Sequence, residues 1–163
     1  STFIINALMK RDFTQRFGFL VNDVAKLYGE QFDRLAREHI GLSRAQCRLL
    51  GALTMHGDEE PMSQIELAHK LGLSAMGVAG LCDRMVAAGW IRREPCATDR
   101  RVNEVHLEPR AEEALDAALT IGDALHARVL DAFTQAERIQ LVALLAKARS
   151  GLVNLSADAQ VPV

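Results

Sequence analysis

The sequence has 163 residues, about one domain's length, with 49% hydrophobic and 25% charged residues and a formal net charge of −2. This composition is globular and excludes a disordered or low-complexity chain. The longest uncharged run, Leu71 to Cys82, is too short to span a bilayer, and no N-terminal segment reads as a secretory signal. Three cysteines at irregular spacing predict no disulfide framework, so we expect a cytoplasmic protein with no membrane partner.

Basic residues are concentrated between Arg84 and Arg101, where five arginines accompany only Glu94 and Asp99. Acidic side chains gather later, from Glu108 to Asp131. A locally basic segment on a mildly acidic protein is typical of a nucleic-acid contact surface. The alternative is an ordinary surface with a chance arginine cluster, and charge alone favours that alternative.

The first predicted element is a long amphipathic helix. Apolar residues recur at gaps of three and four from Phe13 to Leu35, and the helix is expected to end before Gly41. A helix of this length usually packs against something extended.

Capping residues then announce three shorter helices. Ser43-x-x-Gln46 and Ser63-x-x-Glu66 are capping boxes, in which the hydroxyl and the longer side chain each satisfy a free backbone N–H. After the turn Gly72-Leu73-Ser74, Ser74 is the expected N-cap of a helix that ends at a left-handed Gly89. Two short helices joined by such a turn predict a helix-turn-helix.

Beyond Gly89 the pattern changes to short strands. Residues 90–95 and 102–107 predict a β-hairpin with two adjacent arginines in its connection. Pro109 suits the first position of a helix through residue 129, and a last helix starts at the capping box Thr134-x-x-Glu137 and runs through Ala148. The sequence therefore predicts a mostly α fold with a small β-hairpin wing (α+β), a winged helix-turn-helix.

Within this frame the sequence resembles the MarR family, the multiple-antibiotic-resistance regulators of bacterial transcription. The resemblance covers residues 62–107 closely, and the flanking helices agree with the family layout. It is carried by Met62-Ser63-Gln64-x-x-Leu67-Ala68-x-x-Leu71, Asp83-Arg84-Met85-x-x-x-Gly89-Trp90-Ile91-x-Arg93 and Asp99-x-Arg101.

The resemblance implies a homodimeric repressor that binds a palindromic operator in double-stranded DNA and is released by a small, often aromatic or phenolic, effector. Residues 1–163 would form one unit, with dimerisation helices in 1–40 and 110–163 and the DNA-binding region in 43–107. It also implies that Asp99 steadies the wing by pairing with a nearby arginine while Arg101 reaches the minor groove. No effector-binding residue can be assigned from the sequence.

The expected recognition helix presents few side chains to a DNA groove. Apart from Ser74 and Arg84 it offers mainly small residues, so base choice is expected to depend on methyl contacts, close backbone approach and groove shape. Gly80 indicates either an unusually close approach to DNA or a slack position. The residues expected to contact DNA are Ser63, Ser74, Ala75, Gly77, Gly80, Arg84, Arg93, Asp99, Arg100 and Arg101.

Several of these residues also have simpler interpretations. Ser63 and Ser74 are helix caps first, and Arg84 could pair with the adjacent Asp83. Arg92, Arg93 and Arg100 are expected to be solvated, with two of them touching phosphate. Trp90 is expected to pack under the hairpin.

Spacing offers little support for other chemistry. The five histidines form no i, i+4 pair and none lies near a cysteine at ligand spacing, so no metal site and no cofactor is expected. A redox role for Cys96, beside the wing arginines, is a weaker alternative. No nucleophile elbow, P-loop or dinucleotide fingerprint is present, so we expect no enzyme. The rival hypothesis is a winged-helix protein-interaction module without specific DNA binding.

Overall fold

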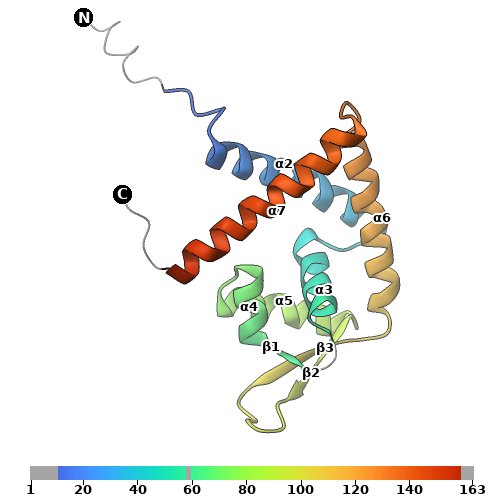
Figure 1. The fold of residues 1–163 in the computed structure, drawn as a ribbon. Helices are drawn as coiled ribbons and strands as arrows, with labels where there is room; N and C mark the ends of the chain where they lie inside the picture. The colour runs from blue at the N-terminus through green and yellow to red at the C-terminus, as the bar shows by residue number, and fades with distance from the viewer. Residues whose placement is uncertain (1–10, 58–59, 159–163) are drawn as a thin grey trace, which may run out of the picture. The chain divides into compact units, whose positions relative to one another are not determined.

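In the computed structural model of the protein, residues 11–57 and 60–158 are described (Figure 1). The outer parts of the expected dimerisation segments, residues 1–10 and 159–163, lie outside this range. The chain divides between Gly122 and Asp123 into two compact units. Within the described ranges, no helix is both long enough and apolar enough to cross a membrane.

The first unit contains the winged helix. Its helices are α2 (Phe17–Ile40), α3 (Arg44–His56), α4 (Gln64–Leu71) and α5 (Ala75–Ala87), and its strands are β1 (Met62–Ser63), β2 (Ile91–Pro95) and β3 (Asn103–Leu107). Helix α6 (Ala111–Val129) begins in this unit and crosses the boundary, and α7 (Gln135–Asp158) lies in the second unit. The predicted mostly α fold with a small β-hairpin wing is confirmed, and the β2–β3 hairpin is called the wing below.

The capping chemistry sets the helix starts as predicted. Both hydrogen bonds of the capping box are present at Ser43 and at Ser63. The Ser74 hydroxyl accepts a hydrogen bond from the Gly77 N–H at 3.0 Å. Gly72 and Gly89 have φ angles of 67° and 78°, the left-handed conformation that a residue without Cβ adopts at low cost. These local signals hold α4 and α5 in the helix-turn-helix arrangement.

The sheet has three antiparallel strands in the order β1-β3-β2. Met62 and Arg93 both lie opposite Val105, and Glu94 lies opposite Glu104. Because side chains alternate across a strand, one face carries the buried Met62, Ile91 and Val105, and the other is polar. Strand β1 was not predicted, because its two residues are too few to show a period.

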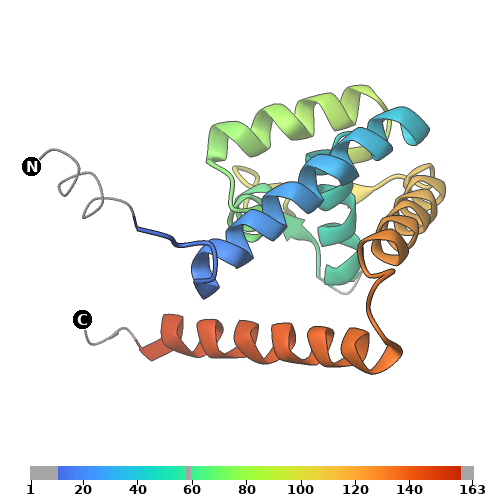
Figure 2. The ribbon, with the colours of Figure 1, turned by 90° about the horizontal axis from the view of Figure 1, so that it is seen from above.

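The core fills the space between α3, α4, α5 and the inner face of the sheet. Its largest fully buried side chains include Leu49, Leu50, Leu67, Val78 and Met85. Burying a side chain of this size contributes about 1.5–3 kcal/mol. In α2 only Gly29 and Ala36 are buried, and Phe32 and Leu35 pack against the core, so it is the second half of this long helix that is anchored (Figure 2).

Three predicted boundaries were wrong. Helix α2 begins at Phe17 rather than Phe13, since residues 13–16 form a turn with the Arg16 N–H bonded to the Phe13 carbonyl. Pro109 precedes α6 instead of opening it, because the Ala111 N–H bonds to Glu108 in a turn. Helix α7 continues past Ala148 to Asp158 and runs through Gly151, so this glycine does not end it.

Candidate nucleic-acid interface

Helix α5 has one buried and one open side. Val78, Leu81, Cys82 and Met85 form the buried stripe, while the residues from Ser74 through Gly77 are exposed. Gly77, Gly80 and Arg84 follow one another at helical spacing on the open side. Gly80 is half-buried. Ala75 is exposed and is the first residue of α5. The open side therefore presents a nearly bare helix surface that ends in one arginine.

The two glycines on this side differ in the room around them. A Cβ at Gly77 would lie 3.1 Å from the Ser74 hydroxyl, tighter than an ordinary contact. A Cβ at Gly80 would meet only the Arg84 guanidinium, at 3.6 Å. Gly77 therefore leaves space for the N-cap hydroxyl, whereas packing within the protein does not explain Gly80.

The Arg84 side chain is exposed. Among residues 11–57 and 60–158 it has no hydrogen-bond or ion-pair partner, and only its backbone carbonyl is engaged, by the Ala88 N–H. The alternative pairing with Asp83 is wrong, because Asp83 pairs with Arg93 instead. A guanidinium left unpaired beside a bare helix face is well placed to bind an anion.

Arg93 corrects a further expectation. Its side chain is 25% exposed rather than solvated, and it donates to Asp83 Oδ1 at 2.6 Å. The same guanidinium donates to Gln64 Oε1 at 2.9 Å and to the Ala79 carbonyl at 3.2 Å. One residue of β2 is thereby tied to both α4 and α5, and this group fixes the wing against the helix-turn-helix.

At the tip of the wing, Asp99 and Arg101 form a two-pronged pair. Arg101 Nε and Nη2 each donate to one oxygen of Asp99 at 3.0 Å, and the Arg101 backbone N–H donates to the same carboxylate. The Arg101 side-chain hydrogen bond is the main cause that lowers the Asp99 pKa. Arg101 remains 90% exposed, and the exposed Arg100 has no partner among the described residues.

The remaining predicted residues take structural positions. Ser63 is half-buried as the N-cap of α4, accepting from the Glu66 N–H at 3.2 Å. Arg92 is exposed but bonded to Glu94 at 2.7 Å and to the Leu107 carbonyl. Trp90 packs against the core edge, with the Arg110 guanidinium 4.0 Å above its ring.

Two of the three cysteines are buried, and the third, Cys96, lies in the wing. Burial raises the pKa of the Cys47 thiol to about 11 and also raises that of Cys82. Cys96 is half-buried in the wing, 3.2 Å from the Thr98 hydroxyl. Of the three arginines that the sequence places near Cys96, Arg93 and Arg101 are engaged by Asp83 and Asp99, and Arg100 has no partner among the described residues.

Met76 is the residue that the sequence interpretation missed. It is 85% exposed at the start of α5, on the side that also carries Ala79. The signal was present, since Met76 lies two residues before the buried Val78 and so outside the buried stripe. An exposed thioether offers the apolar contact that a thymine methyl group accepts.

A helix-turn-helix followed by an arginine-bearing hairpin defines a winged-helix protein. Residues 40–102 match the model of the MarR family. The resemblance inferred from the sequence is confirmed over this matched region.

Solved structures agree on the fold. A probable transcriptional regulator from Pseudomonas aeruginosa is 23% identical with a TM-score of 0.70, covering 84% of this chain and 99% of that chain. Wild-type MarR from E. coli in its apo form is 22% identical with a TM-score of 0.73, covering 81% and 95%. BpsR from Bordetella bronchiseptica, whose DNA binding is regulated by 6-hydroxynicotinic acid, is 21% identical with a TM-score of 0.69, covering 86% and 97%. The fold is that of MarR-family transcriptional regulators.

Proposed function

We propose that this protein is a DNA-binding transcriptional regulator, a homodimeric repressor of a palindromic operator. The observation that carries the proposal is a pair of arginine side chains without a partner in the described part of the chain, Arg84 on α5 and Arg100 on the wing, together with the 90% exposed Arg101. A helix of this size fits the major groove, and free guanidinium groups beside it suit phosphate or base edges. A protein of this kind acts on DNA in the cytoplasm and is not an enzyme.

The contacts divide by chemistry. Ser74 lies at the N-terminus of α5, where free N–H groups attract a phosphate. Gly77, Gly80 and Ala75 let the helix approach the base edges, and Arg84 contacts phosphate or guanine. Arg101, steadied by Asp99, enters the minor groove. Arg93 positions the wing and does not touch DNA. Ser63 caps α4 and lies close to the DNA backbone.

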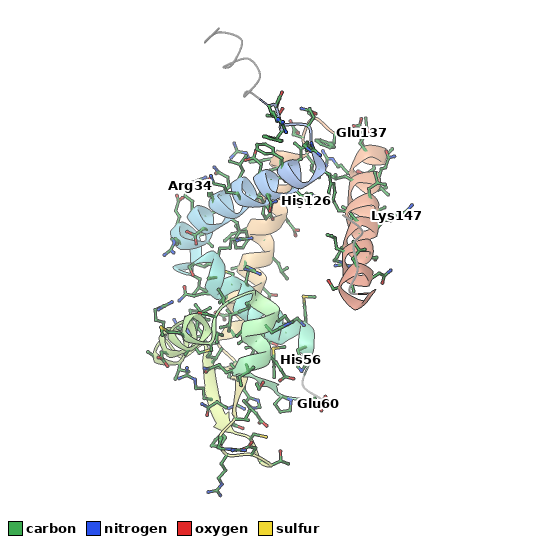
Figure 3. All side chains as sticks on the ribbon, turned by 90° about the vertical axis from the view of Figure 1, so that its left-hand side faces the viewer. Arg34, His56, Glu60, His126, Glu137 and Lys147 are labelled. Atoms are coloured by element: carbon green, nitrogen blue, oxygen red, sulfur yellow. The ribbon has the colours of Figure 1, made fainter. Side chains whose placement is uncertain are left out.

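A salt titration of duplex binding tests this proposal. Neutralising phosphates releases counterions, so log K should fall steeply with log salt. Each substitution removes one contact from each protomer of the proposed dimer, so Arg84→Ala and Arg100→Ala should each lower the slope by about 1.8. The matched control is Arg34→Ala, because Arg34 is an exposed arginine of α2 at the opposite end of the first unit from the wing (Figure 3). Binding without salt dependence, or none at all, would favour the protein-interaction module.

The dimer is supported by the apolar surface of the long helices. In α2, Phe17 and Val24 are each 60% exposed and Leu27 is 52% exposed. In α7, Ile139 is 63% and Leu145 is 52% exposed. Soluble monomers rarely leave large apolar patches exposed, so we propose that dimerisation helices in 1–40 and 110–163 cover these side chains in a twofold pair.

Light scattering at micromolar concentration should return twice the 17.9 kDa mass of one chain. Val24→Glu should shift the mass towards the monomer, because a charge would enter the apolar interface. Ile65→Glu is the control, since Ile65 is also an exposed apolar residue, at 72%, but lies on α4. A monomeric parent protein would contradict the dimer.

The effector is proposed to be a small aromatic acid. A hollow of about 330 Å³ in the first unit is lined by Ile40, Trp90, Arg110, Glu113 and Ala117. The Arg110 guanidinium lies 4.0 Å over the Trp90 ring, and we propose that it pairs with the carboxylate of the effector beside that ring. Trp90 is the single tryptophan, so quenching of its fluorescence by 6-hydroxynicotinic acid measures binding directly. Arg110→Gln should abolish the quenching, and no quenching in the parent would place the effector elsewhere.

A further inference from the structure

The outer face of the wing carries three side chains that the DNA contacts do not use. Glu94 on β2 lies directly opposite Glu104 on β3, and His106 lies two residues further along β3. Side chains alternate across a strand, so these three share the face opposite the buried Ile91 and Val105. One donor atom from each lies within 4.8 Å of the other two.

The spacing of these atoms fits a shared metal ion. His106 Nε2 lies 3.5 Å from Glu94 Oε2 and 3.4 Å from Glu104 Oε2. In a tetrahedral zinc site with bonds of about 2.0–2.1 Å, two ligand atoms stand about 3.3–3.4 Å apart. The imidazole nitrogen therefore already has the separation from each carboxylate that a bound ion requires.

The same nitrogen has no hydrogen-bond partner among the described residues. His106 Nε2 is also shielded from solvent. Buried polar atoms are almost always paired, so an orphaned nitrogen between two carboxylate oxygens points to a cationic partner. The His106 and Glu104 side chains are 23% and 19% exposed, which leaves an ion reachable from solvent.

Arg92 orients the Glu94 carboxylate by a hydrogen bond. Its Nε donates to Glu94 Oε1 at 2.7 Å, while Oε2 of the same carboxylate faces His106. A ligand oriented by a neighbouring hydrogen bond holds a metal better than a free one. Both strands of the wing also hold the donors on regular backbone, which favours a defined geometry.

We propose that Glu94, Glu104 and His106 bind one divalent transition-metal ion, with zinc the best fit. One imidazole and two carboxylates are ligands that zinc accepts, and three protein ligands leave the fourth position to water. The ion would neutralise two carboxylates on the wing that carries Arg100 and Arg101. This further step rests on the proposed function: zinc should strengthen DNA binding, because it reduces the repulsion between these carboxylates and the DNA phosphates.

Calorimetric titration with zinc in a non-chelating buffer tests the site. The parent protein should bind one zinc ion per chain, and His106→Ala and Glu104→Gln should each weaken that binding at least tenfold. The controls are His126→Ala on α6 and Glu108→Gln, an acid next to the site but outside the donor set. Circular dichroism checks that each variant is folded. No zinc binding by the parent, or zinc binding that is unchanged in His106→Ala, overturns the proposal.

Duplex affinity with and without zinc tests the coupling separately. Zinc should tighten DNA binding by the parent several-fold and leave His106→Ala unaffected. If zinc binds but DNA affinity does not change, the site stands and the coupling is wrong. If the protein binds no DNA at all, the proposed function fails, and the zinc titration still decides the site.

Discussion

Replacing Asp83 with asparagine separates two roles for Arg93, because they predict effects of opposite sign. If Arg93 positions the wing, Asp83→Asn loosens the link at its shortest bond, 2.6 Å, and DNA binding weakens. If Arg93 contacts phosphate, the substitution removes a carboxylate near DNA and frees the guanidinium, so DNA binding tightens. The structure favours the first role, since Arg93 also bonds to Gln64 and to the Ala79 carbonyl.

The magnitude follows from exposure. Asp83 is 67% exposed, so the ion pair contributes about 0.2–1 kcal/mol to stability, and the melting temperature should fall by about 0.4–4 °C. Duplex affinity, measured by fluorescence anisotropy, should fall by about threefold to tenfold, within roughly 1.4 kcal/mol. Glu38→Gln, which breaks an exposed ion pair on α2, should leave DNA affinity unchanged. Tighter binding by Asp83→Asn would refute the positioning role.

Three further outcomes are expected. Gly77→Ala should leave the melting temperature nearly unchanged. The added Cβ would lie 3.1 Å from the Ser74 hydroxyl and displace it, which costs about 1 kcal/mol of capping, while the gain in helix propensity is about 0.5–1 kcal/mol. Stabilisation beyond about 1 kcal/mol would contradict this. Arg101→Ala should weaken DNA binding by about 1–3 kcal/mol and reduce the salt slope by about one contact with little change in melting temperature, and unaltered affinity would place it outside the interface. At pH 8, Cys47, whose pKa burial raises to about 11, should react with a disulfide reagent far more slowly than Cys96, and equal rates would argue against its burial.

Local chemistry explains how much of the fold could be predicted. A capping box acts over three residues, so Ser43 and Ser63 mark their helix starts in the sequence itself. The left-handed Gly89 is equally local. Strand β1 has no such mark, because its pairing with β3 depends on residues more than forty positions away.

The candidate site was less predictable for the same reason. Which arginines are free depends on distant acids, and Arg93 is engaged by groups 10 to 29 residues earlier in the chain. The grouping of Glu94, Glu104 and His106 depends on the strand register, which places Glu94 opposite Glu104. A search for metal ligands by helical spacing cannot detect donors that meet across two strands.

Gly80→Leu tests whether α5 lies unusually close to DNA. Within the protein a Cβ at this position meets only the Arg84 guanidinium at 3.6 Å, so a larger side chain has room and the fold should persist. Glycine in mid-helix costs about 0.5–1 kcal/mol relative to alanine, so Gly80→Ala should raise stability by some tenths of a kcal/mol under either reading. If the helix approaches the bases closely, Gly80→Leu should abolish specific binding while circular dichroism remains that of the parent. Gly51→Leu on α3, where an added Cβ meets nothing within 4 Å, controls for bulk and propensity. Should Gly80→Leu bind an operator as tightly as the parent, the position is slack and sequence choice must come from Arg84 and the wing.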